Sequence, residues 1–496
     1  MKKYIIKHCS IFLFISILFS ANINAGNYYD IMSSTLVANV DVANKLGMTV
    51  KGVVVDDSNK PVAGVVVNDG ENFTATDASG IYYLPSNLAR CKYVRISIPA
   101  DYEIEKNVVS SFYSKLSNKE DVNRRDFKLK KRKSNSNEFV FLAISDPQVK
   151  SKAHLARLDS ETIADLKQTI RENRTKNIYA ITLGDNVFDE MELFEPYRAM
   201  LSSLSVPVFS VIGNHDFDLR YNDLHNTKDS SGNYAEEIYE SYFGPADYSF
   251  NIGNIHVVAM KNIDYFAGKK YTERFTPEQF EWLKKDLSYV KPGTTVFLNV
   301  HAPTSNKSSE GSGNSKNTPE LLDILKGYKV HIFSGHTHFY ENEEPVAGIY
   351  DHNIGAACGA WWAGSVNRCG APNGYLVVNV KGDDVKWHYK STGKDNSYQF
   401  RIYKPGEFAT QADYLVANIW DWDSSYQVKW YEDGKLRGTM EQFDDEDQDF
   451  ITMKKGKATG YHTLHLFRVK PNKDAKKITV EVKNRFGETF SESVKL

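Results

Sequence analysis

The sequence predicts a central α/β domain flanked by two all-β sandwich domains. Short strands separated by Asx and Gly turns fill residues 48–133, strands alternate with helices over residues 138–394, and strands return over residues 397–496. A chain of 496 residues is longer than one core needs, so several domains are expected.

In the first of these regions, residues 50–55 and 64–67 form strands around a turn-rich stretch at 56–61, and a further strand pattern covers 74–84. The pattern resembles the carboxypeptidase-regulatory, transthyretin-like sandwiches that precede many secreted bacterial enzymes, and we expect a structural role. Residues 128–137 form a linker, for which a solvated hinge is preferred over a basic docking patch.

The central region alternates strands and helices, which implies a sheet buried between layers. Thr276, Pro277 and Gln279 form a capping box that starts one helix, with Phe280 and Leu283 on its buried face. Two further helices are expected at 160–173 and at 318–327. The expected strands are 139–144, 178–183, 206–212, 294–300 and 330–333.

The last region returns to short strands, at 414–420, 426–430, 463–469 and 478–482. This pattern predicts an immunoglobulin-like or fibronectin-like module. The acidic run 444–447 could bind calcium, but it lacks the spacing of a regular ligand loop, so we expect a solvated turn.

Residues 1–25 have the pattern of a secretory signal peptide. Three lysines lie among the first seven residues, residues 11–19 are almost wholly apolar, and Ala25 provides a small residue for cleavage. The apolar run is short for a membrane span, although an uncleaved anchor is the alternative. We therefore expect an exported protein, periplasmic or secreted, without a transmembrane span.

Composition limits the possible partners. The formal net charge of −2 argues against a nucleic-acid binder, because such proteins favour a basic surface. After the signal peptide the chain keeps Cys91, Cys358 and Cys369. Cys358 and Cys369 could form a disulfide or stay separate thiols, because spacing does not show geometry. The oligomeric state is left open.

Five polar segments follow predicted strands of the central region. Ligand sites of open α/β sheets form at the carboxyl ends of strands, so these segments can meet in one crevice. Their oxygen and imidazole donors suit Mn, Fe or Zn. The segments are Ser145-Asp146-Pro147-Gln148, Gly184-Asp185-Asn186, Gly213-Asn214-His215-Asp216, His301-Ala302-Pro303 and Gly335-His336-Thr337-His338.

The order of these motifs resembles that of the calcineurin-like metallophosphoesterases, a family with a four-layer αββα sandwich. The resemblance covers roughly half of the chain, and the three-part layout is similar to exported enzymes of Bacteroidota. It implies hydrolysis of a phosphomonoester or phosphodiester by in-line attack of a water that two divalent ions, Mn, Fe or Zn, activate. The substrate would be a phosphorylated small molecule, lipid or glycan.

The resemblance also implies roles for individual residues. The ligands of the first ion would be Asp146, Gln148 and His338. Those of the second ion would be Asn214, His301 and His336, and Asp185 would bridge both ions. His215 would be the acid, or the transition-state stabiliser, beside the leaving oxygen, with Asp189 or Asp216 to orient it.

Gln148 departs from the family pattern, which usually has His at this position. A minority of members has Gln, including some diphosphatases that act on nucleotide-type substrates. An amide oxygen is a poorer donor than imidazole for Zn or Fe, so the first site is expected to be weaker or to prefer Mn. Alternatively, Gln148 only hydrogen-bonds a metal-bound water.

Two further segments could contact a substrate. Trp361 and Trp362 could stack a sugar or a base, or could pack against the C-terminal module. Residues 305–317 could border the substrate, although disordered surface is preferred. The alternatives to a phosphomono- or phosphodiesterase are a diphosphatase on nucleotide- or sugar-linked pyrophosphates, and a non-catalytic glycan-binding protein.

Overall fold

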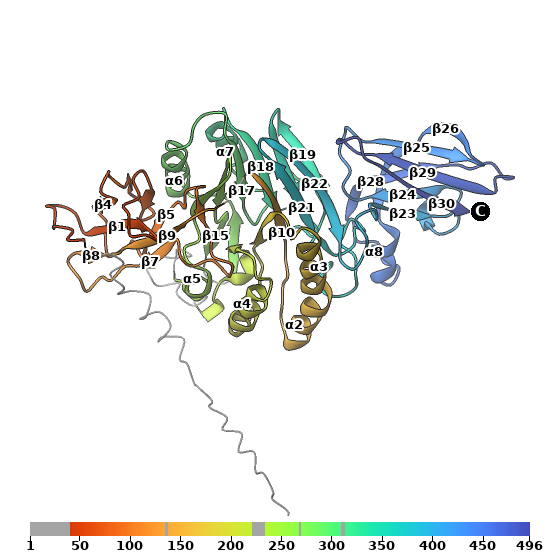
Figure 1. The fold of residues 1–496 in the computed structure, drawn as a ribbon. Helices are drawn as coiled ribbons and strands as arrows, with labels where there is room; N and C mark the ends of the chain where they lie inside the picture. Colours follow the sequence, from red (N-terminus) through yellow and green to blue (C-terminus); the bar gives the residue numbers. More distant parts are fainter. Residues whose placement is uncertain (1–39, 134–136, 221–233, 267–268, 309–312) are drawn as a thin grey trace, which may run out of the picture.

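A computed structural model describes residues 40–133, 137–220, 234–266, 269–308 and 313–496. Three sheet-containing regions follow one another from the N-terminal to the C-terminal end of the chain (Figure 1). The expected signal peptide, residues 1–25, lies outside the described residues, as do residues 134–136 of the expected linker. The first residues of that linker, 128–131, instead belong to a strand, Phe127–Lys131. Among the described helices, none is long and apolar enough to cross a bilayer.

The N-terminal region consists of two sheets that pack on each other and on the central region. The ring centroids of Phe112 and of Tyr248 in the central region are 4.8 Å apart. A backbone hydrogen bond also joins the two regions, since the amide of Asn251 donates to Ile98 O at 2.9 Å. One sheet contains β4 (Ile81–Leu84), β1 (Val50–Asp56), β9 (Phe127–Lys131) and β6 (Tyr102–Glu103), with β8 (Asn123–Arg124) paired to β1. The other contains β3 (Phe73–Ala75), β2 (Val66–Asn68), β5 (Tyr93–Ile96) and β7 (Tyr113–Lys115).

The central region has two sheets face to face. Phe141 of the first sheet packs on Phe297 and Phe333 of the second, at centroid distances of 5.5 and 5.9 Å. The first sheet has the order β12 (Val208–Val211), β11 (Asn177–Leu183), β10 (Glu138–Ile144), β21 (Gly374–Lys381), β22 (Asp384–Ser391). The second has the order β13 (Tyr248–Ile252), β14 (Ile255–Ala259), β17 (Thr295–Asn299), β18 (Lys329–Ser334), β20 (Ile349–Asn353), β19 (Glu341–Val346).

Helices cover the outer faces of both sheets, which completes the four expected layers (Figure 1). Alternation along β10 explains this, since Phe139 and Phe141 face the other sheet while Val140 and Leu142 face helices. Over the first sheet lie α2 (Lys152–Leu158), α3 (Ala164–Glu172), α4 (Phe194–Ser202) and α5 (Glu237–Phe243). Over the second lie α6 (Pro277–Leu287) and α7 (Thr318–Ile324).

The helix ends differ from expectation in two places, one of which is the helix expected at 318–327, since α7 ends at Ile324. The capping box of α6 is confirmed, because the Gln279 amide donates to Thr276 Oγ1 at 3.3 Å and the Thr276 amide donates to Gln279 Oε1 at 3.0 Å. The helix expected at 160–173 begins earlier, at Lys152, where the Ser151 side chain caps it. A π-helical turn at Asp159–Ile163 then joins α2 to α3.

The C-terminal region has two four-stranded sheets. They contain β23 (Phe400–Tyr403), β24 (Leu415–Ile419), β28 (His462–Val469) and β27 (Glu441–Glu446), and β26 (Lys435–Thr439), β25 (Gln427–Glu432), β29 (Lys477–Lys483) and β30 (Thr489–Lys495). The expected solvated turn at 444–447 is wrong. Its first three residues end β27, and buried Asp447 caps α8 (Gln448–Met453) by accepting from the Asp449 and Phe450 amides.

The cysteines are separate thiols. Cys91, Cys358 and Cys369 are all buried and free, so Cys358 and Cys369 are not bridged to each other. Cys369 Sγ instead accepts from the Tyr340 amide at 3.2 Å.

Candidate metal centre

The five polar segments meet at one edge of the two sheets. They follow β10, β11 and β12 in the first sheet, which are mutually parallel, and β17 and β18 in the second. Five of the seven expected ligands have a left-handed backbone conformation. This conformation costs about 1–3 kcal/mol for each residue and persists only where surrounding contacts enforce it. Their φ angles are 47° for Asp146, 42° for Gln148, 48° for Asp185, 71° for His336 and 56° for His338.

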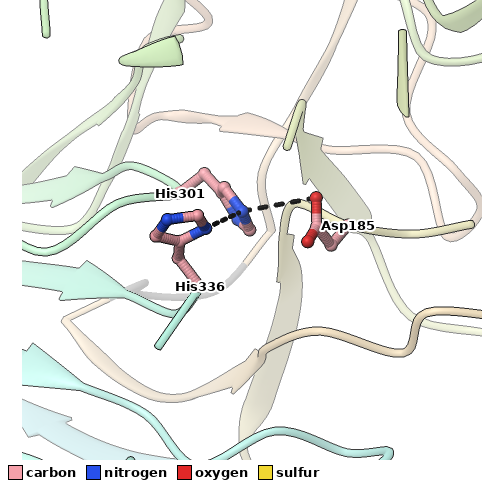
Figure 2. Close-up of side chains that lie close together, drawn as sticks. All are labelled: Asp185, His301 and His336. Carbon is pink, nitrogen blue, oxygen red and sulfur yellow. Dashed lines mark hydrogen bonds and ion pairs between the residues drawn. The ribbon is translucent and has the colours of Figure 1, made fainter. Parts of the chain in front are cut away.

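Four donors form the half of the centre expected for the second ion. One donor atom from each of Asp185, His301 and His336 lies within 4.8 Å of the others (Figure 2). His301 Nε2 lies 3.3 Å from Asp185 Oδ1, 3.1 Å from His336 Nδ1 and 3.0 Å from Asn214 Oδ1. These lone-pair atoms converge on one point, as ligands of a cation do.

The half expected for the first ion contains two polar atoms without partners. Asp146 Oδ1 and His338 Nε2 are buried, lie 3.7 Å apart, and have no hydrogen bond among the described residues. The other oxygen of Asp146 accepts from the His336 amide at 2.8 Å and from Ser145 Oγ. A buried polar atom without a partner costs free energy, and a divalent cation between these two atoms would satisfy both. The residues present therefore fit a metal ion here.

Each of the three imidazoles is anchored through one ring nitrogen. His301 Nδ1 lies 2.8 Å from Leu183 O, and His338 Nδ1 lies 2.6 Å from Gly359 O. His336 Nε2 lies 3.5 Å from Glu273 Oε1. A carbonyl or carboxylate at one nitrogen fixes the proton there, which leaves the lone pair of the other nitrogen for a metal.

Glu273 was missed by the sequence analysis. It lies on β16 (Lys270–Glu273), which pairs with β15 (Ile263–Phe266) in a two-stranded hairpin beside the centre. Nothing in the spacing of the motifs places this hairpin next to His336, so only the folded chain shows that Glu273 orients a ligand.

Gln148 contacts the expected bridging carboxylate. Its Nε2 donates to Asp185 Oδ2 at 2.8 Å, and its backbone amide donates to Asp185 O at 2.8 Å. Its side-chain oxygen lies 3.9 Å from Cys358 Sγ. The side chain is buried within the centre, with its amide nitrogen toward Asp185.

The charges of the centre favour positive groups beside Asp185. Burial alone would raise the pKa of the Asp185 carboxyl. The imidazoles of His301 and His215 outweigh this effect, so the pKa lies well below its usual range. Burial lowers the pKa of His301, but the Asp185 carboxylate outweighs it and raises this pKa to about 9. The centre therefore favours cationic charge beside the buried Asp185 carboxylate.

His215 lies at the rim of the centre, with its side chain a quarter exposed. Its amide donates to Asp185 Oδ1 at 2.9 Å, and its ring stacks on Phe188 at 3.8 Å. Its Nδ1 lies 2.9 Å from Asp189 Oδ1. Burial lowers the pKa of His215, but the Asp185 and Asp189 carboxylates outweigh it, so the pKa is raised.

Asp216 does not contact the His215 ring. Its carboxylate accepts from the Gly213 and Val187 amides at 2.8 and 3.0 Å, and from Asn186 Nδ2 at 2.9 Å. Burial and the nearby Asp185 raise the pKa of Asp216 to about 7. Of the two candidates for orienting His215, Asp189 is the one that contacts its ring. Asp216 instead holds together the backbone segments at Gly213 and Val187.

The two tryptophans have different surroundings. Trp362 is 8% exposed, and its Nε1 donates to Pro147 O at 3.1 Å, so it offers little surface for stacking a sugar or a base. Trp361 stacks on His338 at 4.7 Å and packs against a hydrophobic cluster that includes Phe450 of the C-terminal region. In the segment 305–317, for which disordered surface was preferred over a substrate border, residues 309–312 lie outside the described residues. Asn306 and Ser315 are buried, and Gly313 lies against His336.

Three sequence models that describe parts of one protein family match successive parts of the chain. The N-terminal model of the calcineurin-like phosphoesterases matches residues 48–132, the model of the calcineurin-like phosphoesterase itself matches 139–340, and the C-terminal model matches 351–490. Together they cover most of the chain. The protein belongs to the calcineurin-like phosphoesterases.

Individual relatives are similar over smaller parts. Purple acid phosphatase 15 of Arabidopsis thaliana is 32% identical over 155 residues, which are 28% of this chain and 26% of that protein. The match thus spans about a quarter of the relative's length. A purple acid phosphatase from yellow lupin is 13% identical, with 76% of this chain and 69% of that chain covered and a TM-score of 0.37. A dimetal phosphatase from Danio rerio is 14% identical, with 51% and 97% covered and a TM-score of 0.36.

Calcineurin-like phosphoesterases are metal-dependent hydrolases of phosphoric ester bonds. The family uses a dimetal centre, and the converging donors described above lie within the part of the chain that the catalytic model matches. Membership of the family favours an enzyme over the alternative of a non-catalytic glycan-binding protein.

Proposed function

We propose that this phosphoesterase hydrolyses a phosphomonoester or phosphodiester outside the cytoplasm. Asp146, Gln148 and His338 would hold one ion, Asn214, His301 and His336 the other, and Asp185 both. The observation that carries the assignment is the pair of unpartnered buried atoms, Asp146 Oδ1 and His338 Nε2, beside the cluster around His301. When bound, two divalent ions supply Lewis acidity and an activated water for in-line displacement.

His215 would act at the leaving oxygen. Asp189 holds Nδ1, which leaves Nε2 to donate a proton to the departing group. Phe188 stacks on the ring and limits its rotation, so the orientation that Asp189 sets is kept. The peptide amide of His215 is tied to Asp185, which fixes the imidazole relative to the shared metal ligand.

A diphosphatase is the second candidate. Its support is Gln148, the residue that departs from the usual His, which lies in contact with Asp185. Cleavage of a pyrophosphate bond would use the same donors, since both reactions displace an oxygen from phosphorus.

Turnover assays separate these candidates. The protein is assayed with added Mn²⁺ on p-nitrophenyl phosphate, on bis(p-nitrophenyl) phosphate and on a nucleoside diphosphate sugar. Hydrolysis of either nitrophenyl ester supports the first candidate, and cleavage of the sugar nucleotide alone supports the second. No turnover of any of the three would contradict the assignment of the centre.

The location outside the cytoplasm rests on the first 25 residues alone. Sequencing the N-terminus of protein from the cell envelope or medium tests it. A mature chain that starts just after Ala25 is expected, and an intact Met1 in the cytoplasmic fraction would contradict it.

A further inference from the structure

Arg368 lies between two aromatic rings next to the metal centre. Its guanidinium carbon is 4.5 Å from the ring centre of Trp361 and 4.2 Å from that of Tyr461. Trp361 also stacks on His338 at 4.7 Å, and the Arg368 amide donates to His338 O at 2.9 Å. The guanidinium is therefore one aromatic ring away from an expected metal ligand.

Arg368 differs from the other arginines that stack on aromatic rings. Each of the others pairs with a carboxylate, whereas among the described residues Arg368 has none, and its Nε is buried without an acceptor. The paired arginines are Arg157 with Glu161, Arg274 with Asp264, Arg401 with Asp449, Arg468 with Glu441 and Arg485 with Asp423.

A second cation shares the same indole. Lys454, directly after α8 in the C-terminal region, places its Nζ 5.4 Å from the Trp361 ring centre. No described carboxylate forms an ion pair with Lys454. Two positive charges on one ring repel each other, and a buried guanidinium without a carboxylate partner is disfavoured. An anion at this place would relieve both effects.

The C-terminal region is held tightly at this point. A Cβ on Gly370 would lie 2.0 Å from the Asp447 carboxylate carbon, so only glycine allows the loop carrying Arg368 to approach α8 so closely. Asn418 Nδ2 donates to Cys369 O at 2.8 Å in the same contact. These contacts hold the C-terminal region, which carries Lys454 and Tyr461, against the loop that carries Arg368.

We propose that Arg368 and Lys454 bind a second anionic group of the substrate, a carboxylate or a further phosphate, while the scissile phosphate lies at the metal centre. The proposal rests on the function proposed above and narrows its substrate class. A guanidinium held by two rings presents its N–H groups in a fixed plane, which suits a planar carboxylate or a phosphate. The C-terminal region would thus take part in substrate selection.

A matched pair of substrates tests the proposal. We would compare 4-carboxyphenyl phosphate with its uncharged carboxamide counterpart on the full chain with Mn²⁺. Arg368→Gln should lower kcat/KM for the carboxylate about 10-fold or more, mainly through KM, with less than about a twofold change for the carboxamide. Lys454→Gln should shift the same ratio in the same direction, and exposed Lys455→Gln serves as the control.

Binding supplies a readout that does not depend on turnover. Calorimetry with a non-hydrolysable 4-carboxyphenyl phosphonate should show the same loss of affinity in Arg368→Gln, and none with the carboxamide phosphonate. Equal losses on both compounds, or no loss on either, would overturn the proposal. If the wild-type protein turns over neither substrate, hydrolysis of phosphomonoesters is contradicted, whereas the calorimetric comparison still decides the role of Arg368. Should Arg368→Gln not fold, Lys454→Gln decides by the same criteria.

Discussion

The two halves of the metal centre differ in their donors, although one carboxylate would serve both. Around His301, two imidazoles and the Asn214 amide converge with Asp185. Around Asp146, His338 supplies the one imidazole among the described residues, and the remaining donors are oxygens and the Gln148 amide. One edge of the sheets thus makes a nitrogen-rich and an oxygen-rich site. We expect Zn or Fe to prefer the first kind and Mn the second.

Replacement of the shared carboxylate should disable both halves of the metal centre. Asp185 lies within reach of His301 and of Gln148, so Asp185→Asn affects both halves. We expect most bound metal and nearly all activity to disappear, measured by elemental analysis and by nitrophenyl ester hydrolysis. Near-normal turnover in this variant would rule out a bridging role.

His215 belongs to neither half, and its removal should leave both intact. General acid catalysis contributes about 10²–10⁴-fold, so His215→Ala should lower kcat within that range while metal content is unchanged. The loss should be larger for alkyl esters than for nitrophenyl esters, whose leaving group needs no proton. Equal losses would indicate electrostatic stabilisation of the phosphoryl oxygens, and loss of metal would show that His215 has been misassigned.

Glu273 allows the nitrogen-rich half to be weakened alone. It orients His336 through Nε2, and such outer partners contribute about 10–100-fold to metal affinity. Glu273→Gln should lower the affinity of the tighter Zn²⁺ site by that factor in a competition titration with a chromogenic chelator. Glu278→Gln, an exposed carboxylate change on α6, is the matched control. An unchanged affinity would mean that His336 is held without Glu273.

A substitution at Gln148 should strengthen metal binding in the oxygen-rich half, and we expect this to be the smallest of the four effects. Gln148→His would replace an amide by an imidazole, a better donor to Zn and Fe. More metal should survive dialysis than in the wild-type protein. If retention is equal or lower, Gln148 acts only through its hydrogen bond to Asp185, and the diphosphatase candidate loses its support.

The motifs predicted most of this centre, because ligands that follow parallel strands must meet at one sheet edge. Asp146, Asp185 and His301 come together for that reason. The partners in the surrounding layer could not be predicted in the same way. Glu273 arrives on a hairpin, and Lys454 comes from another sheet region more than a hundred residues after His338. Such contacts depend on how regions pack, which local patterns do not encode.

The acidic run shows the same limit in the fold. Residues 444–447 look like a solvated turn by composition, yet Asp447 is buried because it accepts from Tyr403 and Asn418 as well as from α8. Similarly, Trp361 and Trp362 are adjacent in sequence but have different partners, since one packs on His338 and the other on Arg157. Residues that are adjacent in sequence can therefore have different surroundings when they lie in a turning loop.

We expect the two unlike sites to share Asp185 and both to be needed for hydrolysis. Titration of the metal-depleted protein with Mn²⁺, followed by calorimetry and by ester hydrolysis in parallel, tests it most directly. We predict two binding steps of different affinity, with activity appearing only as the second step fills. Full activity after one ion per chain, or a single binding step, would contradict the account.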